Sequence, residues 1–403
     1  MSDKIIYSLD IGNSKIKVMV GSIDNLQVIG MGGFNYQDYN SPNFIQNGII
    51  TNMELAQQQV KNCLLEAQIQ SDCTAGGVIL NCAGINLSYY NDSIEYKLHG
   101  KPVTAEHITH LTQQAKKSVQ QYQEFQISQF NVQQYVIDNL YVAKNPLSII
   151  CNSIKMNYNI ILAKNMLINN LNQLIPREFT IEKIVPTATL SALAAVSYDQ
   201  LAQGVCCIDI GHATTNLAIY KNHILQFHLS IPFGGFNVTA TIANRFKLSL
   251  DGAEDIKITK GFCRHYKDKF DHENIQVLDY NGFSKDISNH ILTEIISNKL
   301  QELFNYINQQ IISLNLDGLL LRGYVLTGGV ANTIGICDLA TDILQNSVIT
   351  SKLNYGGDYQ ELVNQNINAT SLGGLIYAKK MMEQNLDTKQ TPSFWQKIRY
   401  YFQ

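Results

Sequence analysis

The sequence predicts an α/β protein built from two similar lobes that face each other across a cleft. Three observations support this fold class. The chain has 403 residues, which is more than a single hydrophobic core usually organises. Strand-like runs alternate with amphipathic helical stretches, as they do in α/β folds. One hairpin motif also occurs twice, and its two copies are separated by about half of the chain.

The composition excludes several classes of protein. The 33 acidic residues nearly balance the 30 basic residues, so no broad positive field exists to attract nucleic acid. Hydrophobic residues form 45% of the chain, which is enough for a packed core. No apolar run reaches the roughly 18 residues of a membrane-spanning helix, and we expect no secretory signal because the chain starts with a strand-like pattern. The eight cysteines lack metal-site or disulfide spacing, which indicates reduced thiols.

The first half of the chain predicts a sheet, flanking helices and an insertion. Residues 5–9 and 15–20 are rich in β-branched and apolar residues, which favour strands. Residues 53–69 have the periodicity of an amphipathic helix, and a buried strand is expected at 77–82. Residues 86–156 are polar and rich in Gln and Tyr, as in an inserted subdomain with its own small sheet. Further elements are expected as a helix at 104–121, strands at 159–163 and 181–185, and a helix ending near 174.

The second half begins with a helix of small residues at 187–197, which suits close packing against a neighbour. A second strand pair follows at 205–210 and 216–220. The polar residues 383–392 include a proline and are typical of a linker. The remaining predicted elements are helices at 236–247, 251–260, 287–314 and 332–345 and a strand at 324–326.

The repeated hairpin carries the clearest functional signal. The first copy reads Leu9-Asp10-Ile11-Gly12-Asn13-Ser14, and the second reads Ile208-Asp209-Ile210-Gly211-His212-Ala213-Thr214-Thr215. A single hairpin of this kind is usually an ordinary turn with an aspartate. Two copies in mirrored positions instead favour a clamp for the phosphates of a nucleotide, since they come from opposite lobes.

The residue types in these hairpins suit anion and metal binding. A glycine turn lets backbone N–H groups converge on an anion without interference from a Cβ atom. Asp10 and Asp209 end the preceding strands and could hold Mg²⁺ through water, because Mg²⁺ gives up its water shell reluctantly. The predicted phosphate contacts are Gly12, Asn13, Ser14 and Lys15 in the first turn and Gly211, His212, Ala213, Thr214 and Thr215 in the second.

Two further segments are suited to the nucleoside part of a nucleotide. Val325-Leu326-Thr327-Gly328-Gly329 is a buried strand that ends in two glycines, so its backbone can lie flat against adenine or ribose. Glu254 and Lys257 are three residues apart on one face of a helix, from which they could reach the ribose and the base. The alternative for this pair is an ordinary surface salt bridge.

These elements, in this order, resemble the superfamily of actin, sugar kinases and heat-shock chaperone ATPases, and within it the FtsA family of bacterial cell-division proteins. The resemblance covers nearly the whole chain. It is carried by LDIGNSKIKVMVGSI, GVILNCAGINL, GVCCIDIGHATTNLAIYKNHILQFHLSIPFGG, AEDIKITKG, YVLTGGVANTIG and ATSLGGLIYAKK. It implies an actin-like fold of two RNase H-like domains that face a nucleotide cleft, with a family-specific inserted subdomain and a C-terminal amphipathic helix. It also implies ATP and Mg²⁺ as cofactors, with Gly234, Gly235, Glu254, Lys257, Gly328 and Gly329 around the adenosine.

The resemblance implies a division of the chain and a function. The function is that of an ATP-binding protein that polymerises on the cytoplasmic face of the cell membrane at the mid-cell septum. It would tether FtsZ filaments there and help to recruit later division proteins. The implied parts are a first lobe core (1–81 and 158–186), the inserted subdomain (82–157), a second lobe core (187–232 and 313–382), a small subdomain (233–312), a linker (383–392) and a membrane-targeting helix (393–403).

The implied partners are the C-terminal tail of FtsZ, other copies of the chain, an anionic lipid surface and later division proteins, with no nucleic acid. The FtsZ tail is expected on the small subdomain. Candidates there are the long helix at 287–314 and the basic residues Arg264, Lys267 and Lys269, and the sequence does not choose between these and a plain solvated face.

Two departures from the family pattern bear on ATP hydrolysis. The second phosphate loop of the family usually reads G-G-G-T-x-D, whereas this chain has His212, Ala213 and Asn216 at the second, third and sixth positions. The side chains of His212 and Ala213 restrict how closely backbone approaches phosphate, although His212 itself could contact phosphate. Hydrolysing relatives also place a Glu or Gln near the segment that reads Ile184-Val185-Pro186-Thr187-Ala188 here. We therefore expect ATP binding with slow or no hydrolysis, because phosphoryl transfer depends on such positioning.

The last eleven residues predict an interfacial helix. At about 100° per residue, five apolar side chains share one arc roughly 120° wide. Basic residues flank that arc, so the aromatic rings could enter the acyl boundary while the cations reach anionic headgroups. The alternative is a helix docked on the protein's own core. The predicted membrane residues are Phe394, Trp395, Lys397, Ile398, Arg399, Tyr401 and Phe402.

Two other functions share this fold. A small-molecule kinase would need a catalytic base in the cleft and would gain nothing from a detachable aromatic tail. An actin-like protein of pilus assembly would typically lack the C-terminal helix. The tail therefore favours the cell-division protein over both.

Overall fold

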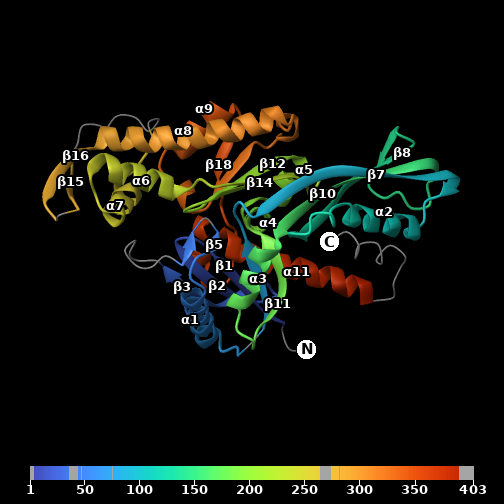
Figure 1. Ribbon diagram of the computed structural model, residues 1–403, viewed down its shortest axis with the longest axis horizontal. Helices are drawn as coiled ribbons and strands as arrows, with labels where there is room; N and C mark the ends of the chain where they lie inside the picture. The colour runs from blue at the N-terminus through green and yellow to red at the C-terminus, as the bar shows by residue number, and fades with distance from the viewer. Residues whose placement is uncertain are drawn as a thin grey trace.

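The computed structural model describes residues 4–35, 44–46, 48–74, 76–263, 274–280 and 282–389. Two lobes, each built on a five-stranded sheet, form most of this part of the chain. A third, four-stranded sheet projects to one side, and the small helical subdomain lies at the opposite end of the molecule (Figure 1). The predicted two-lobed α/β architecture is confirmed.

The two five-stranded sheets have the same topology. In each, three antiparallel strands are followed in the sheet by two strands parallel to the first. This shared order confirms the internal repeat that the two hairpins indicate. The first sheet, in spatial order, is β11 (Thr180–Pro186), β6 (Gly77–Cys82), β1 (Ile5–Ile11), β2 (Lys15–Ser22) and β3 (Gln27–Asn35). The second is β14 (Ile224–Ile231), β13 (Thr215–Lys221), β12 (Val205–Ile210), β17 (Tyr324–Thr327) and β18 (Val348–Thr350).

Helices cover both faces of the first sheet. On one face, α1 (Met53–Ser71) and α3 (Asn165–Leu174) bury their apolar sides. On the other, α4 (Thr187–Ala195) and α11 (Ala369–Lys389) pack in a core that contains side chains from both sheets. A Cβ atom on Gly373 of α11 would lie 1.9 Å from the backbone oxygen of Leu190 in α4. Gly373 therefore allows α4 and α11 to cross closely between the lobes.

The small subdomain follows the second sheet's first three strands. Its helices α6 (Gly235–Phe246), α7 (Leu250–Lys260) and α8 (Asn289–Ser313) agree with the predicted ranges to within a few residues. The hairpin of β15 (Asn274–Leu278) and β16 (Ser284–Ser288) was not predicted. Figure 1 shows α8 lying across the top of this part of the molecule. The other short elements are β4 (Ile45–Gln46), β5 (Ile49–Ile50), α5 (Tyr198–Gln203), α9 (Ile336–Leu344), α10 (Gln360–Val363), η1 (Asp317–Leu319), η2 (Gly329–Asn332) and η3 (Asn366–Asn368).

The insertion has its own sheet and core. Its elements are β7 (Leu87–Pro102), α2 (Ala105–Ser118), β8 (Phe125–Ile137), β9 (Tyr141–Ala143) and β10 (Ile150–Lys164), with the strand order β7-β10-β8-β9. Strand β10 continues without a break past residue 157, where the inserted subdomain was expected to end. The insertion also contacts the second lobe, because Asn159 Nδ2 donates to the Leu225 backbone oxygen at 2.7 Å and the Tyr89 hydroxyl donates to that of Gln226.

The end of the described chain differs from the expected linker. Helix α11 runs to Lys389, so most of the segment expected as a linker at 383–392 continues this helix. Its polar residues include good helix formers, and the helix is already nucleated by its packed first half. No helix in the described part of the chain is long and apolar enough to cross a membrane. The predicted interfacial helix at 393–403 lies outside the described residues.

Candidate nucleotide site between the lobes

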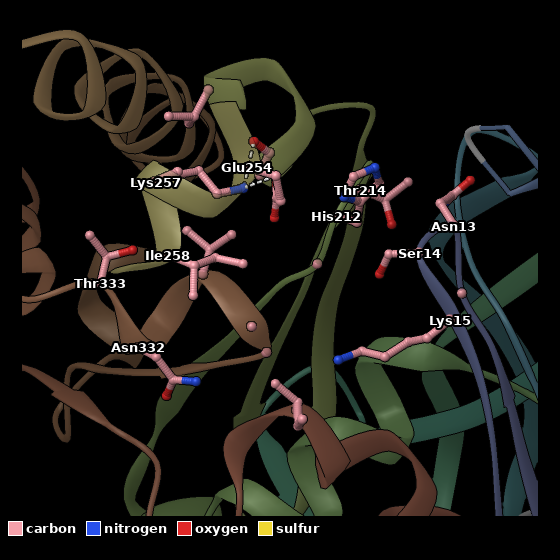
Figure 2. A pocket seen from close by; sticks show the side chains of 18 of the residues that line it. Asn13, Ser14, Lys15, His212, Thr214, Glu254, Lys257, Ile258, Asn332 and Thr333 are labelled. Atoms are coloured by element: carbon pink, nitrogen blue, oxygen red, sulfur yellow. Dashed lines mark hydrogen bonds and ion pairs between the residues drawn. The ribbon is translucent and has the colours of Figure 1, made fainter. Parts of the chain in front are cut away.

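A cavity of about 1200 Å³ lies between the lobes, and both repeated hairpins contribute to its wall. Figure 2 shows Lys15 extending into this cleft from the first hairpin, with His212 and Thr214 above it and Glu254 and Lys257 across from it. The predicted residues that line the cavity are Asp10, Gly12, Asn13, Ser14, Lys15, Asp209, Gly211, His212, Thr214, Gly235, Glu254, Lys257, Gly328 and Gly329. Ala213, Thr215 and Gly234 do not line it.

The two turns have the same geometry. The Gly12 N–H donates to the Lys15 backbone oxygen at 2.9 Å, and the Gly211 N–H donates to that of Thr214 at the same 2.9 Å. A Cβ atom on either glycine would lie 3.1 Å from that accepting oxygen. The tight turn therefore favours glycine in both lobes, and it places Lys15 and Thr214 at equivalent positions.

The N-terminus of α6 supports the second turn from behind. The Gly235 N–H donates to the Gly211 backbone oxygen at 2.9 Å, and the Phe236 N–H donates to that of His212 at 2.7 Å. A Cβ atom on Gly234 would lie 2.5 Å from the same His212 oxygen, so Gly234 permits this close packing. The Thr215 hydroxyl donates to the Phe233 backbone oxygen at 2.8 Å. Gly234 and Thr215 thus hold the loop in shape from outside the cavity.

Asp10 and Asp209 line the same cavity and are each held by neutral donors. Asn81 on β6 donates from Nδ2 to Asp10 Oδ1 at 2.7 Å. Its own Oδ1 accepts the Ile11 N–H at 2.8 Å, which fixes the amide's orientation. Asp209 accepts hydrogen bonds from the hydroxyls of Ser191 and Thr370. Asn81 was not predicted as a site residue, although it is the one amide in the otherwise apolar strand β6 (GVILNC), and that contrast is a signal in the sequence.

The electrostatics of this pair fit a divalent cation. Burial raises the pKa of Asp10 to about 6, against the opposing charge of Lys17 and with the help of Asp209. Burial also raises the pKa of Asp209, although the Ser191 and Thr370 hydroxyls lower it in part. Two carboxylates in a shared, partly desolvated site suit Mg²⁺ bound through water. The described residues contain no cluster of three or more His, Cys, Asp or Glu that could hold a metal directly.

Lys17 is a second cation in the first hairpin, and it was not predicted as a site residue. It pairs with Asp10 in the register of β1 and β2. Its ammonium donates to the Ile367 backbone oxygen and to Asn368 Oδ1, both in η3 of the second lobe. Burial, and then repulsion from Lys15, lowers the pKa of Lys17 to about 7. Lys17 therefore links the lobes.

Lys257 serves mainly to hold Glu254. An ammonium group has three hydrogens, and Lys257 Nζ has protein acceptors at Gly235 O (3.2 Å), Thr239 Oγ1 (2.9 Å) and Glu254 Oε2 (2.6 Å). Burial would raise the pKa of Glu254, but the Lys257 charge and the donated hydrogen bonds outweigh it and lower that pKa. The alternative of an ordinary surface salt bridge is therefore wrong, because this ion pair is a partly buried network in the cavity wall.

His212 occupies the turn where the family pattern has glycine. Burial lowers the pKa of His212 to about 4, so the ring is neutral at pH 7. Its ring lies 5.4 Å from that of Phe236, measured between centroids. A neutral imidazole contributes hydrogen-bonding groups to the turn but no positive charge.

The strand-to-turn segment after β17 requires its first glycine. Gly328 has φ +84°, and a Cβ atom there would lie 2.4 Å from Asp209 Oδ1. The next residues carry side chains into the cavity. Figure 2 shows Asn332, Thr333 and Ile258 on the side of the cleft away from the first hairpin. These three residues belong to the segments AEDIKITKG and YVLTGGVANTIG that carry the family resemblance, but they were not predicted as contacts.

Comparison with known proteins places the chain in a family. The family model "Cell division protein FtsA" matches residues 206–373, and the model "SHS2 domain inserted in FTSA" matches residues 84–162. Together the two models cover more than half of the chain. A curated relative, the cell division protein FtsA of Buchnera aphidicola subsp. Acyrthosiphon pisum, is 28% identical, with 96% of this chain and 93% of the relative aligned.

Solved structures show the same fold. The chain resembles a structure of the PilM-PilN type IV pilus biogenesis complex with a TM-score of 0.65 and 15% identity, covering 94% of this chain and 98% of that one. It also resembles MreB5 of Spiroplasma citri bound to ADP, with a TM-score of 0.57 and 18% identity, covering 95% and 98% of the two chains. At these identities the likeness concerns the actin-like fold alone. With both FtsA models matching in order and an FtsA relative aligned along nearly its whole length, the chain belongs to the FtsA family of bacterial cell-division proteins.

Proposed function

We propose that this protein binds ATP with Mg²⁺ between its lobes, polymerises on the cytoplasmic membrane and tethers FtsZ filaments to it. The observation that carries the nucleotide part is the pair of equivalent hairpins that line one cavity from opposite lobes. One hairpin supplies Lys15, both supply turns with glycine, and two carboxylates lie between them. A related fold, MreB5 of Spiroplasma citri, has been solved with ADP, which supports the same use of the cleft here.

The nucleotide is expected to act as a structural ligand with slow or no hydrolysis. Within 184–188, Thr187 is the residue that lines the cavity, and its hydroxyl donates to the Cys82 backbone oxygen at 3.1 Å. A hydroxyl engaged in this way offers no carboxylate or amide to orient water. A steady-state ATPase assay tests this. A turnover typical of a kinase, about 1–100 per second, that is lost in Asp10→Ala would contradict it.

Membrane attachment is assigned to residues 393–403. Each of the two cations contributes roughly 1 kcal/mol near an anionic surface, and the buried apolar side chains add to this. One copy binds reversibly, whereas a filament presents many tails to the same surface and binds avidly. Co-sedimentation of the full chain with vesicles containing anionic lipid is the direct test. Binding that persists undiminished in Trp395→Glu would refute the assignment.

FtsZ tethering is assigned to the small subdomain, where α8 and the basic residues Arg264, Lys267 and Lys269 are the candidates. The three basic residues lie outside the described residues, so the test uses α8. The partly exposed Lys299 on α8 lies 2.9 Å from the exposed Glu302, and an ion pair near the surface is easily exchanged for one with another anion. A peptide of the FtsZ C-terminal tail should therefore bind more weakly to Lys299→Glu than to wild type. Lys116→Glu, on the insertion, is the matched control and should bind normally. Equal binding by all three proteins would exclude this part of α8 as the contact.

Recruitment of later division proteins is assigned to the inserted subdomain, and localisation tests the proposal as a whole. A fluorescent fusion should form a ring at mid-cell. A pilus-assembly protein or a small-molecule kinase of the same fold would instead give a polar or diffuse signal, and either result would contradict the proposed function.

A further inference from the structure

Three polar side chains form a series of hydrogen bonds that leads from the end of β18 into the cleft. Ser351 follows that strand and is buried. Its hydroxyl donates to Asn366 Oδ1 at 2.7 Å. Asn366 Nδ2 in turn donates to Asn332 Oδ1 at 3.0 Å. Asn366 and Asn332 both line the cavity, so this series of hydrogen bonds ends at the place where a ligand would lie.

This series of hydrogen bonds sets the orientation of the Asn332 carboxamide. Because the Ser351 hydroxyl engages the oxygen of Asn366, the nitrogen of Asn366 faces Asn332. The oxygen of Asn332 is thereby used, and its Nδ2 group remains as a donor of two hydrogens. Within the described ranges, no residue accepts a hydrogen bond from that Nδ2. Figure 2 shows the nitrogen of Asn332 on the cleft side.

The surroundings of Asn332 suit a flat heterocyclic ring. Asn332 ends η2, directly after the glycine turn that follows β17. Ile258 and Ile334 line the same cavity and are 70% and 53% exposed, so apolar surface there lacks a cover. Figure 2 places Ile258 and Asn332 on the side of the cleft away from Lys15. If Lys15 marks the phosphate end, Asn332 lies at the base end.

We propose that Asn332 is a specificity-determining residue that donates a hydrogen bond from Nδ2 to a ring nitrogen of a purine base. Asn366 and Ser351 are positioning residues that keep the amide turned this way. The inference rests on the proposed nucleotide binding and adds to it the residue that reads the base. A fixed donor recognises an unprotonated ring nitrogen and rejects a C–H at the same place, because that exchange leaves a polar group unpaired.

The test compares ATP with its 1-deaza, 3-deaza and 7-deaza analogues, each of which replaces one ring nitrogen by C–H. Wild-type protein should bind one of the three roughly threefold to tenfold more weakly than ATP. Asn332→Ala should bind that analogue and ATP within twofold of each other. Asn332 is exposed, so the variant should fold normally. The proposal is overturned if wild type binds all three analogues like ATP, or if the loss is the same in Asn332→Ala.

Two more variants test the direction of the hydrogen bond. Asn332→Asp still accepts from Asn366 but cannot donate, so it should bind ATP no better than Asn332→Ala. Asn366→Asp should turn the Asn332 amide around and remove the deaza discrimination, while the control Thr333→Val, on a neighbouring cavity residue, should retain it. If Asn332→Asp kept full affinity and wild type instead discriminated against purine riboside triphosphate, which lacks the 6-amino group, Asn332 would be an acceptor and the proposal would be wrong.

The outcomes separate this inference from the proposed function. Wild-type protein that binds no ATP at all would overturn both. Wild-type protein that binds ATP but shows no discrimination dependent on Asn332 would overturn only the assignment of Asn332.

Discussion

The two phosphate hairpins share their backbone and differ in their charge. Each has a tight turn with glycine, an aspartate at the end of the preceding strand and the same register between its two strands. Lys15 and Lys17 of the first hairpin correspond to Thr214 and Asn216 of the second. The repeat therefore keeps the turn that presents backbone N–H groups, while the positive charge is concentrated in one lobe. Two hairpins with the same backbone geometry can therefore contribute differently to ligand binding.

Replacing the equivalent residues Lys15 and Thr214 should give the largest difference in ATP affinity between the two hairpins. Lys15→Ala removes a charged hydrogen-bond donor, worth about 1.5–3 kcal/mol, so ATP affinity should fall roughly tenfold to a hundredfold. Thr214→Ala removes a neutral donor and should cost about 1 kcal/mol, or roughly fivefold. Calorimetric titration of both variants measures the difference. Equal losses would mean that the two hairpins contribute alike.

Lys17 and Asn216 provide a second matched pair, with hydrogen exchange as the measurement. Lys17→Met removes the donor that joins β2 to η3 of the other lobe, so amide exchange across 366–368 should accelerate roughly tenfold. Asn216 bonds instead to Ser230 and Thr214 within its own lobe. Asn216→Ala should thus leave exchange across 366–368 unchanged. Unaltered exchange in Lys17→Met would show that this link does not hold the lobes together.

The smallest expected effect concerns His212. Its pKa of about 4 lies below its ordinary value because of burial, and a bound phosphate should raise it by roughly one unit. A ligand that raises a pKa binds more tightly as pH falls through the interval between the free and bound values. The ratio of the ATP affinity of wild type to that of His212→Ala should therefore be about twofold larger at pH 5 than at pH 7.

An NMR titration of the His212 ring with and without ATP measures the same shift directly. An unchanged pKa in the presence of saturating ATP would place His212 away from the phosphates. The second turn would then contribute through its backbone and Thr214 alone.

The sequence predicted the parts of the site that depend on local pattern. Gly12 and Gly211 were predictable because a tight turn between two strands needs glycine, and Gly328 was predictable from a strand that ends in a glycine pair. Glu254 and Lys257 were predictable from their helical spacing. In each case neighbouring residues in the chain carry the whole signal.

The residues that were missed depend on contacts between distant segments. Lys17 meets η3 more than 300 residues later, and Asn81 reaches Asp10 from another strand. The role of Asn332 depends on its hydrogen bond with Asn366, which is 34 residues away in the sequence. The contact of the insertion with β14 was likewise not predictable, because nothing in a polar, tyrosine-rich segment tells which surface it meets.

The prediction of a linker at 383–392 was wrong over most of its length, because it rested on local composition alone. A polar composition is typical of a linker, but residues up to Lys389 continue a helix whose packed beginning nucleates it. The division of the chain into parts and the membrane role of 393–403 stay predictions.

Hydrogen exchange of the full chain with and without MgATP tests the central claim most directly. If ATP lies between the lobes, it should protect the amides of Gly12–Lys15 and Gly211–Thr214 together, since one ligand then contacts both turns. Protection of both turns is the predicted result. ATP binding that protects only one of them, or neither, would contradict a clamp formed by the two hairpins.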